Sequence, residues 1–260
     1  MKRLAVLLVV AAALLAPSAA LASGVVLKVQ KAAHLVAVTN GKTKVSLVHS
    51  AAASRLKVGQ RVAMKGRTLR NGTLAASSMR VIGRAHKVHF RGLLLKRSGT
   101  RLVLSAGGAI ISVRRGAVRR TSSANDTAPT PGSTVDVTAT VTSTDELDED
   151  NVSTVSAATP GGAIEGKLTL GTGKITVVSD QMALVINVPS TFDLSKFANG
   201  DEVLAKFTQG ADGLLTLTDL SGNDNVQEAD NNDDGDNGDD NGDNGGNGNG
   251  GGGGGDDNGD

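Results

Sequence analysis

Few residues of this chain have side chains that commonly do chemistry. The chain has four histidines: His34, His49, His86 and His89. All four lie between residues 23 and 121, a stretch without Asp or Glu, so a Ser-His-Asp arrangement would need an acid from elsewhere in the chain. His86 and His89 stand three residues apart on an expected strand, so their side chains would point to opposite faces of the sheet and would make a poor pair of metal ligands. We interpret the histidines as ordinary surface or half-buried residues and predict that the protein is not an enzyme.

A second candidate is a phosphate-loop spacing. Residues Gly161–Lys167 match G-x-x-x-x-G-K. Leu168 stands where Ser or Thr would bind magnesium, and the residues around it favour a strand rather than a helix. We therefore reject a nucleotide site and predict no cofactor.

Two acidic clusters could hold Ca²⁺ loosely, since calcium takes oxygen ligands. The first, on an expected hairpin, consists of Asp145, Glu146, Asp148, Glu149 and Asp150. The second has half of a calcium-loop spacing, at Asp230, Asn232 and Asp234. Asn241 stands where that loop needs a bidentate acid, and flanking helices are missing. A solvated negative surface is the simpler reading of both clusters, so we predict no dedicated metal site.

The N-terminal residues predict export. A basic head at Lys2 and Arg3, an apolar run and the small-residue site Ala20-Leu21-Ala22 are typical of a signal peptide over residues 1–22. The apolar run is too short for a membrane span, which takes about 20 residues, and no later segment is apolar enough. The chain has no Cys, hence no lipid-anchor site and no disulfide. We expect a secreted, periplasmic or cell-envelope protein without a transmembrane segment in its mature chain.

The elements that position these residues repeat along the chain. Four positions recur at a constant offset of 141 residues: Gly59, Val62, Gly72 and Leu74 return as Gly200, Val203, Gly213 and Leu215. A weaker copy with an offset of 73 has Gly132, Val135 and Leu147. A fixed self-similarity indicates one structural unit used several times.

Each unit reads as a set of short strands. Apolar, β-branched-rich runs are separated by hairpin signals such as Asn40-Gly41 and Asn71-Gly72. Ala76 and Met79 are three residues apart, which breaks the period of two and predicts a β-bulge. Five short strands in so small a unit would leave open edges as a flat sheet, and closure into a small barrel removes them.

The repeated pattern resembles a bacterial family of secreted repeats, domain-of-unknown-function family 5666. The residues that carry the resemblance are Leu56, Gly59, Val62, Gly66, Gly72, Leu74, Ala76 and Met79, with their partners in the third unit. The second unit departs from the pattern, because Asp145 replaces the hairpin glycine and a loop is inserted. The resemblance implies small, all-β, barrel-like units in exported proteins, and it implies no catalytic residues.

Together these observations predict an all-β fold of three tandem small OB-like β-barrel units, followed by a disordered acidic tail of Asp, Asn and Gly. The units span residues 23–84, 85–158 with an inserted loop at 114–131, and 159–222, and the tail spans 223–260. The tail has too few apolar residues to bury a core.

The charges are segregated. Residues 23–121 carry 21 Lys and Arg and no acid, residues 122–222 carry 4 bases and 14 acids, and residues 223–260 carry 12 acids and no base. Solubility with compositional drift would account for this, and so would a polyanion partner for the basic half. The candidate polyanion-binding residues are Lys42, Lys44, Arg61, Lys65, Arg67 and Arg70.

An exported protein could meet wall polymers, anionic lipid surfaces or extracellular nucleic acid. The first unit has no aromatic residue, which argues against base stacking and against specific nucleic-acid readout. We expect a non-enzymatic binding or scaffold protein of the cell envelope or extracellular space. The alternative is a structural or calcium-responsive surface protein that acts through its acidic clusters and tail.

Overall fold

The computed structural model describes residues 20–115, 128–155, 161–180 and 182–222. Residues 1–19 of the predicted signal peptide (1–22), most of the inserted loop, the acidic tail and the cluster of Asp230, Asn232 and Asp234 lie outside the described residues. The last three residues of that peptide, residues 20–22, are described as the start of the first strand. All described strands belong to one compact unit. Within the described residues, none of the helices has the length and apolar character needed to cross a membrane.

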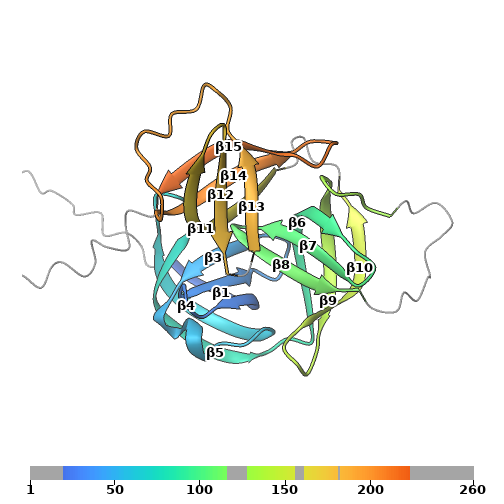
Figure 1. The fold of residues 1–260 in the computed structure, drawn as a ribbon. Helices are drawn as coiled ribbons and strands as arrows, with labels where there is room; N and C mark the ends of the chain where they lie inside the picture. The colour runs from blue at the N-terminus through green and yellow to red at the C-terminus, as the bar shows by residue number, and fades with distance from the viewer. Residues whose placement is uncertain (1–19, 116–127, 156–160, 181, 223–260) are drawn as a thin grey trace, which may run out of the picture. The chain divides into compact units, whose positions relative to one another are not determined.

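The first barrel runs from residue 20 to residue 84 and contains a short 3₁₀ helix (Figure 1). Its elements are β1 (Ala20–Gln30), β2 (Leu35–Thr39), β3 (Val45–His49), η1 (Ala51–Arg55), β4 (Gln60–Thr68) and β5 (Leu74–Arg84). The strands close in the order β1-β2-β3-β5-β4, with β1 pairing back to β4. All pairs are antiparallel except β3 with β5. This order with one parallel closure is the five-stranded Greek-key barrel of OB folds.

The second and third barrels repeat this strand order. The second consists of β6 (Lys87–Arg97), β7 (Arg101–Ala106), β8 (Ala109–Arg114), β9 (Thr134–Val141) and β10 (Leu147–Thr154). The third consists of β11 (Gly161–Gly171), β12 (Lys174–Ser179), β13 (Met182–Asn187), β14 (Glu202–Gln209) and β15 (Leu215–Gly222). The predicted fold class of small all-β barrels is confirmed. One detail of the prediction is wrong: Arg114 is the last residue of β8 and not part of the inserted loop.

Equivalent glycines hold equivalent places in the three barrels. Gly59, Gly132 and Gly200 have φ angles of 82°, 88° and 96°, a left-handed backbone that favours glycine. Each donates its N–H at 2.8 Å to a carbonyl of the first strand of its own barrel: Val26, Leu94 and Leu168 respectively. The turn before β4, β9 and β14 is therefore tied to the first strand in the same way each time.

A second set of glycines stands in these first strands. Gly24, Gly92 and Gly166 pair with the repeat-equivalent residues Val62, Val135 and Val203. A Cβ on any of the three would meet a backbone carbonyl of the neighbouring strand: Thr39, Ser105 and Val178 respectively. The first strand can bend from one neighbour to the other only because no side chain fills this point.

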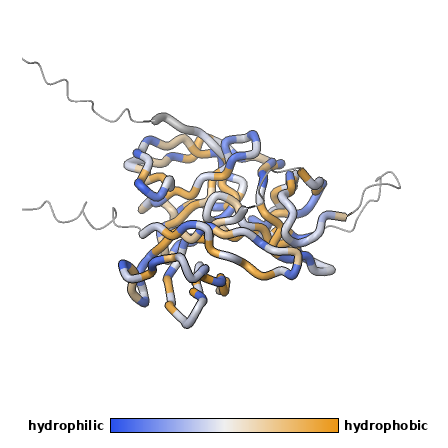
Figure 2. The backbone as a smooth tube through the Cα atoms, turned by 90° about the horizontal axis from the view of Figure 1, so that it is seen from above, coloured by the Kyte–Doolittle hydropathy of each residue, from blue (hydrophilic) through white to orange (hydrophobic). Residues whose placement is uncertain are grey.

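The predicted bulge occurs in all three barrels. Ser77, Asp150 and Thr218 are each the extra residue at a register shift in the last strand pair. These positions keep the repeat offsets of 73 and 141. In Figure 2, hydrophobic and hydrophilic positions alternate along many strands, as expected for barrels with a filled interior.

The first barrel has buried residues both in its interior and on part of its outer surface. Its interior holds Val26, Val36, Val38, Val48, Val62 and Met64, among others. The outer faces of β1, β2 and β3 carry a second apolar set that joins the core of the second barrel: Val25, Leu27, Leu35, Ala37, Val45 and Leu47. All five residues of β2 are consequently buried. Leu93 and Ile110 on the second barrel likewise join the core of the third.

The turn Gly107-Gly108 between β7 and β8 lies where the three barrels meet. A Cβ at Gly107 would overlap the Val45 backbone of the first barrel, and a Cβ at Gly108 would press on Leu204 of the third. The Gly108 carbonyl accepts a hydrogen bond from the Glu165 N–H at 2.8 Å. Because glycine has no Cβ, this turn fits between the first and third barrels without a steric clash.

Candidate functional site

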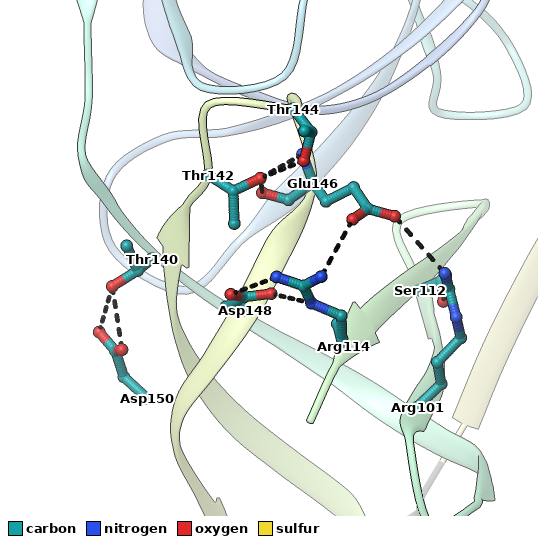
Figure 3. Close-up of polar contacts among 9 residues, drawn as sticks. All are labelled: Arg101, Ser112, Arg114, Thr140, Thr142, Thr144, Glu146, Asp148 and Asp150. Atoms are coloured by element: carbon teal, nitrogen blue, oxygen red, sulfur yellow. Dashed lines mark hydrogen bonds and ion pairs between the residues drawn. The ribbon is translucent and has the colours of Figure 1, made fainter. Parts of the chain in front are cut away.

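The first acidic cluster lies on the β9–β10 hairpin, and its carboxylates face cations of the first two barrels. The ion pairs are Arg84–Asp145 (2.6 Å), Lys57–Asp145 (3.7 Å), Arg101–Glu146 (3.4 Å), Arg114–Glu146 (3.7 Å), Arg114–Asp148 (2.7 Å), Arg115–Glu149 (3.5 Å) and Lys87–Asp150 (3.1 Å). Asp150 also accepts from the Thr140 hydroxyl at 2.9 Å (Figure 3). Thus part of the basic charge that the sequence segregates from the acids is matched by them in space.

Arg114 is the centre of this network. Its Nε and Nη2 donate to the two oxygens of Asp148 at 2.7 and 2.9 Å, and Glu146 bridges Arg114 and Arg101 (Figure 3). The hydrogen bonds from Arg114, reinforced by its charge, hold the pKa of Asp148 below its usual range. A carboxylate committed to a guanidinium in this way offers few free oxygens to a metal ion. Among the described residues, no group of three or more His, Cys, Asp or Glu side chains is placed to hold a metal.

The histidines are dispersed. His34 lies in the β1–β2 turn with a φ angle of 53°, and His86 precedes β6. His89 is exposed on β6. His49 is different, because its Nε2 lies 2.9 Å from Oε1 of Glu165 in the third barrel, and their side chains are 12% and 2% exposed. The acid that the first unit lacks therefore comes from β11 of the third barrel.

The candidate polyanion-binding residues divide into two places. Lys42 and Lys44 lie in the β2–β3 loop, whose Thr43 carbonyl accepts from the Arg91 N–H at 2.8 Å. This loop therefore borders the second barrel. The remaining candidates are together on the β4–β5 ribbon: Arg61, Lys65 and Arg67 on β4, and Arg70 in the turn that follows.

The β4–β5 ribbon presents a basic outer face. Val62 and Met64 point into the barrel core, so the alternating residues Arg61, Lys65 and Arg67 point outward, and all three are exposed. The register of the ribbon pairs Arg80 with Ala63. Residues directly opposite each other in an antiparallel pair share a face, which places Arg80 between Arg61 and Lys65.

Sequence reasoning missed Arg80 as a member of this face. The extra residue Ser77 shifts the register of β5, so simple alternation along that strand does not predict its orientation. The signal was present in the spacing of Ala76 and Met79, which indicated the bulge. With Arg70 at its end, the basic face comprises five cations, and none of them forms an ion pair within the described part of the chain.

The aromatic side chains are not available at this face. Phe90 and Phe207 fill the cores of the second and third barrels at 0% and 1% exposure. Phe192 and Phe197 pack against the core of the third barrel. The described residues thus place no aromatic ring beside these cations for base stacking, and guanidinium and ammonium groups are the chemistry that contacts phosphate or sulfate.

No known family model matches the chain, and no curated protein matches it either. Among solved structures, one similar chain is described as a multidomain protein with nucleic acid binding domains from Streptococcus pneumoniae TIGR4. It has 11% identity and a TM-score of 0.21, and the match covers 76% of this chain and 72% of that one. Another is described as Drosophila Unr CSD456, with 12% identity, a TM-score of 0.21 and coverage of 80% and 98%.

Proposed function

We propose that the protein is a non-enzymatic binding module that holds a linear polyanion on the outer face of the β4–β5 ribbon. The observation that carries this proposal is the row Arg61, Lys65 and Arg67, with Arg80 across the ribbon and Arg70 at its end. Alternate residues of a strand are ~7 Å apart, so the cations form a line rather than a point. A line of charges suits a chain of phosphate or sulfate groups.

The chemistry of the face supports backbone contact without sequence reading. Arginine binds phosphate with a planar fork of donors, and lysine binds it as a point charge. No aromatic residue flanks these cations in the first barrel, so affinity would come from charge neutralisation and would fall as salt rises. With the predicted signal peptide and the resemblance to secreted repeats, we infer that the polymer belongs to the cell envelope or extracellular space.

Binding of single-stranded DNA, a poly(glycerol phosphate) and anionic vesicles at two salt concentrations tests the proposal. Replacing Arg61, Lys65, Arg67 and Arg80 together by Gln should weaken binding of the two linear polymers. For single-stranded DNA the slope of log K against log salt should fall by about 3, at ~0.7 per lost phosphate contact. The vesicles show whether a linear polymer is preferred to a surface of headgroups.

A matched variant removes the same charge elsewhere. Lys31, Lys167, Lys174 and Lys196 are exposed, and no ion pair of the described residues involves them. Their replacement by Gln lowers the net charge equally and should leave most of the affinity in place. Equal losses in the two variants would show that only net charge matters, and the ribbon would not be the site.

A further inference from the structure

Two crevices of similar size lie between successive barrels. The first, about 550 Å³, separates the first and second barrels and is lined by Leu27, Lys28, Leu56, Val58, Arg114 and Glu146, among others. The second, about 560 Å³, separates the second and third barrels and is lined by Leu95, Lys96, Val103, Leu184, Val185 and Leu214, among others. Both volumes lie within the ~300–1,000 Å³ of small-molecule sites.

The two crevices occupy equivalent places in the repeat. Leu27 and Leu95 are both the extra residue at a register shift, three positions after the equivalent glycines of β1 and β6. Lys28 and Lys96 follow them directly. On the opposite wall Glu146 and Leu214 each stand fourteen positions after the equivalent turn glycines, so one repeat position carries an acid in one crevice and leucine in the other.

Strand register extends the equivalence. Arg114 pairs with Asp148 in the single parallel bridge of the second barrel, and Asn187 pairs with Thr216 in that of the third. At the second crevice, Asn187 therefore stands where the first has Arg114, and Thr216 where the first has Asp148. The ion pair at the first crevice has no equivalent there. By the same register, Ser112 of the first crevice corresponds to Val185 of the second.

This difference leaves the second crevice apolar and open. Leu214 is 56% exposed and Val185 is 54% exposed. The equivalent positions in the first crevice are Glu146 and Ser112. The barrels therefore pack without large apolar side chains at these points, and their exposure is not a requirement of the fold. An exposed apolar patch rimmed by polar groups marks a binding site.

One cation stands at the rim of the second crevice. Lys28 of the first crevice pairs with Asp180 at 3.5 Å, whereas Lys96 is exposed and forms no ion pair with any described residue. Arg101 also borders the crevice, but its guanidinium is held by Ser112 and Glu146 on the other side. Lys96 is therefore the charge that a ligand in this crevice would meet.

The walls are held in place before any ligand arrives. The Gln209 amide donates to the Leu95 carbonyl at 3.5 Å and to the Gly213 carbonyl at 3.3 Å. It thus ties the β14–β15 hairpin to the end of β6. Met182 and Leu184 pack against the core of the third barrel and supply an adaptable floor.

We propose that this crevice binds a small amphipathic carboxylate with an alkyl chain, of the medium-chain fatty acid class. The chain lies on Leu95, Leu184, Val185 and Leu214, and the carboxylate pairs with Nζ of Lys96. The occupant is chosen by complementarity: the walls are apolar and the one uncommitted charge is positive. The site is separate from the basic face of the first barrel and does not depend on it.

Calorimetric titration of the full chain with decanoate tests the proposal, with decanol and acetate as probes that lack the charge or the chain. Decanoate should bind more tightly than decanol, and acetate should not bind measurably. Lys96→Gln should weaken decanoate binding about tenfold, the value of one charge-assisted hydrogen bond, and leave decanol unchanged. Lys196→Gln, at an exposed lysine outside the lining of the crevice, is the matched control and should change neither.

Two variants place the polar residue types of the first crevice at the equivalent positions of the second. Leu214→Glu and Val185→Ser replace exposed residues, so the fold should persist, and each should weaken binding of both ligands by about tenfold or more. Leu214→Glu should weaken decanoate more than decanol, because the new carboxylate repels the anion. The proposal is overturned if decanoate does not bind the wild-type chain detectably, or if Leu214→Glu leaves the decanoate affinity unchanged. A wild-type dimer that Leu214→Glu converts to a monomer also overturns it, since a second copy would then be the occupant.

Discussion

Thr39 and Ser105 occupy equivalent positions in the first two barrels, and each donates its hydroxyl to a backbone carbonyl of the barrel that follows. The Thr39 hydroxyl lies 2.9 Å from the His89 carbonyl oxygen, and the Ser105 hydroxyl lies 2.7 Å from that of Ala163. The third barrel has Val178 at this position, 41% exposed and unable to donate. The contact that joins successive barrels thus has no counterpart on the described outer face of the third.

The Ser105 contact can be tested by removing its hydroxyl. Ser105 is 2% exposed, and its Oγ also accepts from the Ala163 N–H at 2.7 Å. Ser105→Ala should lower the free energy of unfolding by about 1–3 kcal/mol, because buried polar groups lose their partner. Urea unfolding measures this. Ser78→Ala, at an exposed position, should stay within about 0.5 kcal/mol, and equal effects of the two changes would contradict the assignment.

The glycines of the first strands predict a steric effect. A Cβ at Gly166 would overlap the carbonyl of Val178, and the β11–β12 pairing prevents either backbone from retreating. Gly166→Ala should therefore cost about 3 kcal/mol of stability, as overpacking does. Gly99→Ala is the control, since a Cβ there meets nothing within 4 Å. Thermal unfolding that fails to separate the two variants would disprove the steric account.

The contact of His49 with Glu165 predicts coupling between the first and third barrels. Glu165 is buried, so His49→Ala removes a partner of a buried carboxylate and should cost about 3 kcal/mol. The cost should be smaller when Glu165 is already Gln, because a neutral amide needs less compensation. A double-mutant cycle should give a coupling energy above about 1 kcal/mol. Additive effects would show that the two side chains act independently.

Arg91 and Asp136 predict a pH dependence. Arg91 donates to both oxygens of Asp136 at 2.7 and 2.9 Å, and these hydrogen bonds, with the charge of Arg91, hold the pKa of Asp136 below its usual range. The folded state therefore binds fewer protons than the unfolded state near and below pH ~4. The stabilisation is present above that pH and is lost as the pH falls through the lower folded pKa.

Asp136→Asn removes this contribution. The difference in unfolding free energy between the wild-type protein and the variant should shrink as the pH is lowered from 6 to 2. Glu202→Gln, at an exposed position outside the described ion pairs, serves as the control. A difference for Asp136→Asn that stays constant over this range would mean that the bidentate contact does not set the pKa.

Local physics made much of the fold predictable. Features that depend on only a few neighbouring residues could be predicted from the sequence. They include hairpin turns such as Asn40-Gly41, the left-handed glycines, and the alternation of Val62 and Met64 with Arg61 and Lys65. Closure followed because short strands cannot leave their edges open. The same alternation predicted the outward bases of β4, and only the bulge at Ser77 hid Arg80.

The outer faces and the charge pairs were decided by packing between barrels. The sequence shows that β2 is apolar but not that a second barrel covers its outer side. It separates bases from acids, whereas Arg84 meets Asp145 across 61 positions and His49 meets Glu165 in another barrel. Spacing along a chain determines strands and turns because their hydrogen bonds are local. Which faces meet depends on how whole barrels fit together, and that depends on all their surfaces at once.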